Sequence, residues 1–503
     1  MPADKFAASV KVSELNATHA EYAANVDAWV DIDLLYRGGH QIRRQASKFL
    51  VRRPKELHDV FSARLERFTY QNCIGTGLGW YEAALFEKPP EVDTRPEAGG
   101  EGEPAKEIAD FYEQFLGNCD RAGTKFKDFW IKVFRGLALF RCAYVLTDLP
   151  LPEQPPVNLK QQKDLGLLNP YLVYYSPANV LNWETDRYGN LEWVVVYTKN
   201  ENTGFLGAGA VIERWYYFNL EQYAVYERLG KAGEKAPKEI ATLQASGLHA
   251  LAKVGRVPLR RIEVSDGLWI GNRALPQAIE HVNADNQLGF ALMMAALAMP
   301  VIITDDDLTQ PTISEVGYFK LTKGSDFKWT EPAGTSFAHL QARIGSLREE
   351  IYRQMYLQAQ GRSTEAAPAV QSGFSKEVDM RPAANVLSAY GDRLLSGMAL
   401  VLEDVAAVRG DNVEFEVRGF HFSTDGGPEE IRNDQSVKDF GVQSDTFHKE
   451  LQKRVVRRHL PDAEAPTIDA IMDEIDKAPT LTEIEAEEKK LQEQSMASSL
   501  SGV

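Results

Sequence analysis

The pattern of hydrophobic and polar positions is most distinctive between Pro276 and Gly410. There it predicts a helix, a small β-rich insert, a second helix, a loop and a long helix. The first helix is expected over Pro276–Met299, because proline suits the first helical turn. This helix ends in an apolar run that Pro300 stops, since proline cannot continue a helix.

The second helix is expected to open at Thr335 or Ser336, which are both good N-cap residues, and to reach Gln360. Its apolar residues recur at alternating spacings of three and four, and such a heptad-like stripe packs against neighbouring helices. The stripe consists of Phe337, Leu340, Ile344, Leu347 and Ile351. It is interpreted as core or inter-subunit packing and not as a cofactor site.

A β-rich insert is expected before the second helix, and a loop followed by a long helix is expected after it. Residues 300–335 hold three short strand candidates, namely Val301–Thr304, Tyr318–Leu321 and Phe327–Thr330. Gly361–Gly373 has no apolar period and is bracketed by glycines, which indicates a flexible loop. The chain then re-enters a helix at Lys376 and keeps it to Arg409, with an interruption at Pro382.

The N-terminal region is predicted to be helical, with one amphipathic helix over Leu15–Leu35 and a long helix from Pro54 to Phe86. Gly75–Gly79 lies inside the second pattern and is rich in glycine, as phosphate-binding loops are. However, no strand precedes it and no Lys-Ser/Thr pair follows it, so close helix packing or a helix break is favoured over nucleotide binding.

Glu91–Lys106 is polar and rich in Pro, Gly and Glu, which predicts a mobile surface loop. The segments that follow are expected to be helices over Ile108–Cys119 and Lys125–Leu139, a strand over Arg141–Thr147 and a mainly β region over Tyr171–Glu263. Within that region the strand candidates are Tyr171–Tyr175, Leu191–Tyr197, Val211–Tyr217 and Tyr223–Tyr226, and Pro258–Val264 leads out of the sheet. Further strand and helix candidates are Val413–Phe422, Ser444–Leu460 and a helix from Pro466.

The charge, the cysteines and the apolar runs of the chain argue against some classes of protein. The chain has 503 residues, is 44% hydrophobic and carries a formal net charge of −16, which argues against wrapping nucleic acid by bulk electrostatics. Its three cysteines are far apart and unpatterned, so a reducing compartment is expected. The most membrane-like run, Leu288–Ile303, is shorter than a bilayer span and contains Pro300, so a buried helix is favoured.

No catalytic or metal-binding motif stands out, and we expect neither enzymatic activity nor a cofactor. Asp305, Asp306 and Asp307 are carboxylates of the kind that hard cations prefer, although adjacent acids in a loop are more often a solvated turn, and no metal site is predicted. The basic cluster Arg454–His459 either contacts phosphate or forms a charged helix face, and the second reading is favoured.

Collinear short motifs carry a resemblance to a known family. They are Leu35–Gly39, Phe49–Glu56, Arg64–Arg67, Phe86–Pro90, Phe134–Asp148, Tyr174–Asn179 and Gln371–Lys376. No single motif is decisive, but together with the order of elements they span most of the chain. On this basis the chain resembles the portal proteins of tailed bacteriophages.

The resemblance implies an α+β, mainly α portal fold, assembled as a homo-oligomeric ring, usually a dodecamer. It assigns residues 1–265 to a wing of N-terminal helices and a β-rich part, 266–299 to the first stem helix, 300–335 to a small β-rich clip, 336–360 to the second stem helix, 361–373 to a tunnel loop, 374–422 to a long wing helix and strand, and 423–503 to a helical crown with a C-terminal tail.

The resemblance also implies a role and partners. The ring would occupy one capsid vertex of the virion, after assembly in the host cytoplasm, and double-stranded DNA would be packaged and ejected through it. The partners would be the terminase large subunit, head-completion or adaptor proteins, and the major capsid and scaffolding proteins, with no membrane. The alternative is a non-viral oligomeric scaffold or adaptor without catalytic activity.

Site residues follow from the same assignment. The tunnel loop would face DNA with Arg362, Ser363, Thr364, Glu365 and Gln371. Arg343 and Arg348 are candidates for the stem lumen, where they would give weak phosphate contacts. The clip would dock the motor and adaptors through Asp305, Asp306, Asp307, Lys320, Lys323 and Lys328.

Overall fold

The computed structural model describes residues 6–96, 103–150, 158, 161–162, 166–203, 209–231, 239–296, 299–303, 326–330, 335–357, 373–420, 444–459 and 465–478. The chain divides into two compact units, Met1–Phe422 and Ser423–Val503. Both helices and strands are abundant, as expected for an α+β protein. The second unit has the range expected for a crown, and that assignment stays a prediction.

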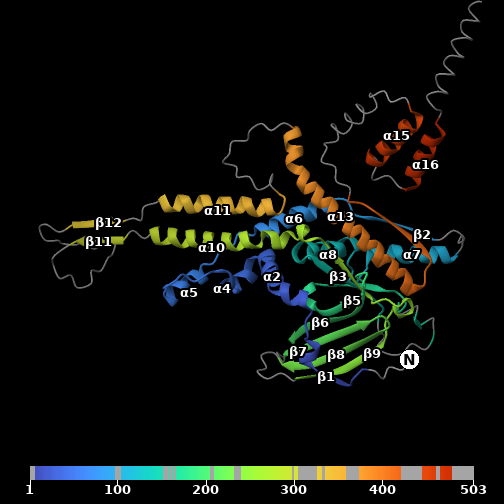
Figure 1. The fold of residues 1–503 in the computed structure, drawn as a ribbon, viewed down its shortest axis with the longest axis horizontal. Coiled ribbons are helices and arrows are strands. Elements are labelled where there is room, and N and C mark those ends of the chain that lie inside the picture. Colours follow the sequence, from blue (N-terminus) through green and yellow to red (C-terminus); the bar gives the residue numbers. More distant parts are fainter. Residues whose placement is uncertain are drawn as a thin grey trace, which may run out of the picture. The chain divides into compact units, whose positions relative to one another are not determined.

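A six-stranded antiparallel sheet forms one part of the first unit, with strand order β1-β9-β8-β7-β6-β5 (Figure 1). Its strands are β1 (Ser9–Lys11), β5 (Val180–Thr185), β6 (Leu191–Thr203), β7 (Gly209–Asn219), β8 (Gln222–Lys231) and β9 (Ile240–Leu248). Trp215 lies opposite Tyr197 on one neighbour and Tyr226 on the other, and its side chain is fully buried. Such cross-strand aromatic sets stabilise a sheet.

A second sheet has the order β10-β3-β4 and places β3 (Cys142–Asp148) at its centre, between β4 (Tyr171–Tyr175) and β10 (Leu259–Glu263). β4 therefore does not belong to the large sheet, and the segment expected to lead out of that sheet is itself a strand. The position of β4 and β10 follows from the packing of β3. β3 is buried along almost its whole length and needs a hydrogen-bonding partner on each edge.

Helices pack around β3 to form the main core. They are α2 (Ala20–Arg37), α6 (Cys73–Leu85), α7 (Glu103–Gly117), α8 (Phe126–Phe140), α10 (Ile270–Ala296) and α13 (Gly373–Arg409). Shorter elements are α1 (Val12–Leu15), α3 (Gly39–Arg44), α4 (Ala46–Phe49), α5 (His58–Glu66) and the 3₁₀ turns η1 (Pro177–Asn179), η2 (Ala252–Val254) and η3 (Asp266–Leu268).

The long helix expected from Pro54 to Phe86 is wrong, because the structure has two helices, α5 and α6, with a break between them. Asn72 causes the new start: its side-chain oxygen accepts a hydrogen bond from the backbone N–H of Gly75 at 2.7 Å, and its amide donates to the carbonyl of Tyr36 at 2.7 Å. The glycine-rich stretch is helical and packs closely. A Cβ at Gly77 would lie 2.5 Å from Met355 Cε, so the close-packing interpretation is confirmed.

The surface loop expected over Glu91–Lys106 is also wrong in part. β2 (Glu91–Pro96) pairs antiparallel with β13 (Val413–Arg418), with Val92 opposite Val417, and α7 starts at Glu103. A partner strand so distant in the sequence leaves no local signal, and only the fold brings the two segments together.

The long helices differ at their ends from the expected bounds. α10 begins at Ile270, so Pro276 lies inside it and not in its first turn. Its opening turns are held by burial of Ile270 and Ala274 in the core, which offsets the hydrogen bond that Pro276 cannot donate. α11 (Thr335–Gln354) starts where predicted and ends before Gln360. The interruption expected at Pro382 is wrong, because α13 continues through this residue as one helix.

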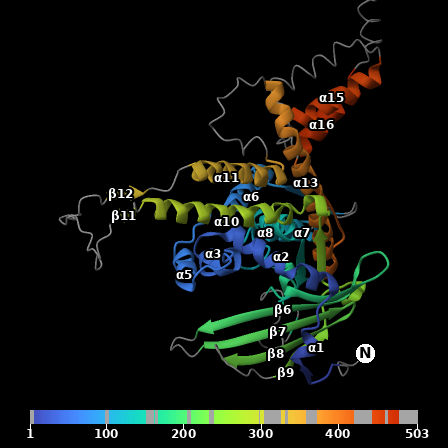
Figure 2. The same ribbon diagram turned by 60° about the vertical axis from the view of Figure 1, so that its left-hand side comes forward.

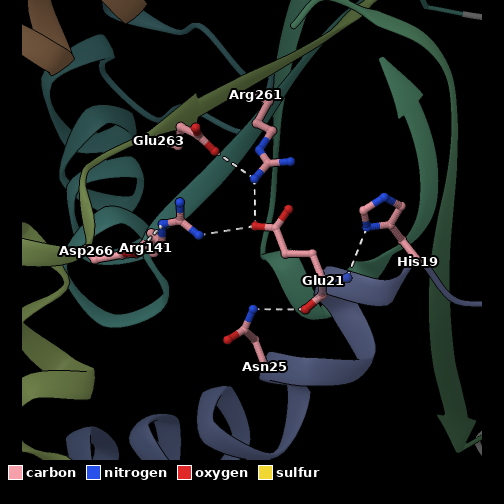
Figure 3. Close-up of polar contacts among 7 residues, drawn as sticks. All are labelled: His19, Glu21, Asn25, Arg141, Arg261, Glu263 and Asp266. Carbon is pink, nitrogen blue, oxygen red and sulfur yellow. Dashed lines mark hydrogen bonds and ion pairs between the residues drawn. The ribbon is translucent and has the colours of Figure 1, made fainter.

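A polar network ties the start of α2 to the second sheet (Figure 3). Glu21 Oε1 accepts a hydrogen bond from Arg261 Nη2 at 2.8 Å and lies 3.5 Å from Arg141 Nη1. The same Arg261 nitrogen lies 2.7 Å from Glu263 Oε2. His19 caps the helix, since its Nδ1 accepts from the N–H of Glu21. The network fixes the first helix of the core to β10.

The second unit, taken by itself, contains a helix pair. α15 (Asp445–His459) and α16 (Ala465–Lys477) meet through Lys453 Nζ and Asp476 Oδ1, 2.6 Å apart. Both lie within about a residue of the predicted helices.

Candidate functional site

The two helices around which the sequence is organised, α10 and α11, form an antiparallel pair (Figures 1 and 2). Near one end Arg273 Nε donates to the backbone carbonyl of Gln354 at 3.2 Å. Further along, Arg343 Nη2 donates to Glu280 Oε1 at 2.5 Å. Residue numbers rise along α10 from the first contact to the second and fall along α11, so the two helices run in opposite directions.

A β-hairpin continues from the far end of the helix pair. β11 (Met299–Ile303) pairs antiparallel with β12 (Asp326–Thr330), with Met299 opposite Thr330 and Ile303 opposite Asp326. Two of the three predicted strands of this insert are thereby confirmed. The third, Tyr318–Leu321, lies outside the described residues.

The proposed docking residues are mostly in the part of the insert that the structure does not describe. Lys328 lies on β12 opposite Val301. The others, Asp305, Asp306, Asp307, Lys320 and Lys323, fall outside the described residues, as do the tunnel-loop candidates Arg362, Ser363, Thr364, Glu365 and Gln371.

Burial falls along the helix pair from its base toward the hairpin. At the base, Ala278 and Val282 of α10 are at most 2% exposed, and Ile351 of α11 is 1% exposed. Toward the hairpin Leu292 is 47% exposed and Phe290 is half-buried. The chain's own core therefore covers only the base of the pair and leaves apolar side chains accessible further out.

The predicted apolar stripe on α11 follows this gradient. Leu347 is 2% exposed and Ile351 is buried, whereas Phe337, Leu340 and Ile344 are half-buried. The stripe thus lies against the rest of the chain at one end, and its packing on a neighbouring subunit stays a prediction.

The two lumen candidates lie in different surroundings. Arg343 is 53% exposed and forms an ion pair with Glu280 across the two helices. Arg348 is half-buried, and its charge lowers the pKa of Cys73, although burial of that thiol raises the pKa overall. Arg348 therefore lies near α6 at the base of the pair, a position less suited to phosphate contact than that of Arg343.

Two asparagines that the sequence analysis missed clamp the N-terminal segment onto α10. Asn283 accepts from the N–H of Val51 at 2.9 Å and donates to the carbonyl of Phe49 at 2.9 Å. Asn286 accepts from the N–H of Thr69 at 2.9 Å and donates to its carbonyl at 2.8 Å. Their spacing of three residues puts both on one helix face, which is the only signal that could have suggested them.

A groove of about 900 Å³ lies beside the helices α2 and α8 and the turn η1. Its lining includes Tyr36, Arg135, Leu139, Tyr174 and Asn179. These residues come from three of the short motifs that carry the family resemblance. Arg135 is held by a bidentate pair with Glu82 at 2.6 and 2.7 Å, so it is not free to act on a ligand.

Two other features bear on the kinds of site that the described residues can form. In that part of the chain no group of three or more His, Cys, Asp or Glu side chains is placed to hold a metal ion. No helix there has both the length and the apolar character that crossing a bilayer requires.

Comparison with known proteins gives matches among solved structures alone, since no family model and no curated protein matches the chain. It is similar to a chain from the neck of an empty GTA particle computed with C6 symmetry, with 13% identity and a TM-score of 0.41, over 80% of this chain and 95% of that one. It is also similar to a chain from the virion of a native gene transfer agent (GTA) particle, with 13% identity and a TM-score of 0.40, over 81% and 97% of the two chains.

Proposed function

We propose that this chain is a portal protein, the ring-forming subunit at the DNA entrance of a tailed-phage or phage-like capsid. The observation that carries the proposal is the antiparallel pair α10 and α11, which ends in the paired strands β11 and β12 and joins the main hydrophobic core only at its base. The collinear motifs found in the sequence support the same assignment.

The uncovered apolar side chains explain why a ring is favoured over a monomer. Leu292, Phe337 and Leu340 gain burial if a neighbouring copy packs against the helix pair, at about 25 cal/mol per Å² of apolar surface removed from water. A closed ring of identical subunits needs two different, complementary faces on each copy, and a pair of long helices has one on each side.

In this proposal the helix pair is the stem, the insert between the helices is the clip that docks the terminase and later the adaptors, and residues 361–373 face the DNA. A net charge of −16 on each subunit keeps the ring from gripping the duplex over its whole surface. Weak contacts from Arg362 or Arg343 then let the DNA slide.

Electron microscopy of the purified protein tests the assembly. Rings are expected, with a mass in solution near twelve times 56.3 kDa. A monomer or a small two-fold oligomer at every concentration would contradict the proposal and favour a scaffold or adaptor.

Deletion of Thr364–Ala369 tests the channel role separately. Rings and procapsids are expected to form normally, while DNA packaging or retention is impaired, because the loop that faces the duplex is shortened. A phage that packages and retains a full genome with this deletion would show that the loop has no channel role, even if rings form.

A further inference from the structure

The segment from Arg37 to Arg67 differs in charge from the rest of the chain. It contains nine Lys and Arg residues and three Asp and Glu residues, a net charge of +6 in a chain of net charge −16. It comprises the short helices α3, α4 and α5 and the links between them. So strong a local excess of one sign creates a potential that attracts the opposite charge.

Most of these cations are on the surface. Eight of the nine side chains are exposed, and two of these, Arg37 and Lys48, form ion pairs with Asp33 and Asp31. The other six are Arg43, Arg44, Arg52, Arg53, Lys55 and Arg67. We call these six the basic surface. Within the described residues, the side chains of Arg44 and Lys55 form no hydrogen bond or ion pair. Arg43 and Arg52 donate only to backbone carbonyls, so their charges are not neutralised.

Contacts within the chain hold the backbone of the segment that carries the basic surface. Arg64 Nη1 donates to both carboxylate oxygens of Glu56, at 2.9 and 2.8 Å, and both side chains are 4% exposed. Asn283 holds the middle of the same stretch against α10 at Phe49 and Val51, and Asn286 holds Thr69, just after its end. A surface ordered in advance loses less entropy on binding.

Two exposed apolar residues lie close to these cations in the sequence, Val51 before Arg52 and Leu57 two residues after Lys55. The side chain of Val51 is 68% exposed and that of Leu57 is 72% exposed, although side chains of these types are more often buried. Contacts to a nucleic-acid backbone need cations and no apolar groups. A protein interface combines charged groups with apolar contact area.

We propose that the basic surface is a docking site for an acidic protein segment that also carries apolar side chains. The acidic groups would contact Arg44, Lys55 and their neighbours, and the apolar groups would cover Val51 and Leu57. This site differs from the tunnel loop and the clip of the proposed function, and it lies on the segment that packs against α10.

Fluorescence anisotropy with the full-length protein tests the proposal. One probe is a labelled 16-residue helical peptide of Glu and Leu, with the leucines on one face. The second has the same glutamates with Ser in place of Leu, and the third is a labelled 16-base-pair DNA duplex. We expect the Glu/Leu peptide to bind most tightly, with an affinity that falls as salt rises.

The double variant R44E/K55E is expected to weaken binding of the Glu/Leu peptide about tenfold, because two attractive charges become repulsive. The control K253E/R393E makes the same charge change at two other exposed cations and should leave binding within twofold. L57S should weaken the Glu/Leu peptide and leave the Glu/Ser peptide unchanged.

Three results would overturn the proposal. The first is no saturable binding of the Glu/Leu peptide at low salt. The second is equal weakening by R44E/K55E and by the control. The third is tighter binding of the duplex than of either peptide, which would assign the surface to nucleic acid. None of them depends on ring formation, so failure here leaves the proposed function standing.

Discussion

The ion cluster at Asp404 gives a sharp test of how the long helix α13 is held. Asp404 is completely buried, and its carboxylate lies 2.5 and 2.8 Å from two nitrogens of Arg260 and 2.6 Å from Arg256 Nη1. Arg260 is on β10, so the cluster joins the helix to the edge of the second sheet. The perturbation is Asp404→Ala.

The loss of stability depends on the two arginines that Asp404→Ala leaves without their carboxylate. Arg260 is only 17% exposed and would lose its carboxylate, whereas Arg256 is 38% exposed and can turn to water. Removing one partner of a buried pair typically costs about 3–5 kcal/mol. Since one of the two arginines recovers hydration, we expect the free energy of unfolding to fall by about 3 kcal/mol.

Urea unfolding, followed by circular dichroism, measures the change. Asp392→Ala is the matched control, because Asp392 is an exposed residue of the same helix, and it should change stability by less than about 0.5 kcal/mol. The triple variant D404L/R256M/R260M should recover most of the loss, since apolar residues can replace a buried ion cluster. A cost below about 1 kcal/mol for Asp404→Ala, with an unchanged denaturant slope, would show that this ion cluster does not hold α13 to β10.

Three further predictions concern other parts of the chain. Leu347→Asp puts a charge into buried packing and should destabilise the protein by about 3–5 kcal/mol and prevent assembly; normal rings would count against the stem assignment. Burial raises the pKa of Asp148 to about 6 from its ordinary 3.8, so stability is full below about pH 4 and declines as pH rises to 6. Asp148→Asn should therefore add about 3 kcal/mol at pH 7 and nothing at pH 3, as measured by urea unfolding, and an equal effect at both pH values would contradict this. Replacing Asp305, Asp306 and Asp307 with Ala should leave ring formation intact and weaken terminase or adaptor binding in a pull-down; unchanged binding with intact DNA packaging would place the docking surface elsewhere.

The elements with local signals could be predicted from the amino-acid sequence alone. The spacing of apolar residues from Phe337 to Ile351 predicted α11, and Thr335 marked its start. The alternating and apolar runs predicted β6, β7 and β8, and the insert between the long helices was recognised as β-rich. Such signals depend on residues within a few turns of one another, so they are readable without the fold.

Contacts between segments that are far apart in the sequence could be seen only in the tertiary structure. The pairing of β2 with β13, the central place of β3 and the clamps of Asn283 and Asn286 join residues that are far apart in the sequence. Asn72 starts α6 within the single helix that the sequence predicted, and its amide donates to Tyr36, which the fold brings close. Backbone groups must find hydrogen-bond partners once they are buried, and which partner is at hand depends on the whole fold and not on the neighbouring residues.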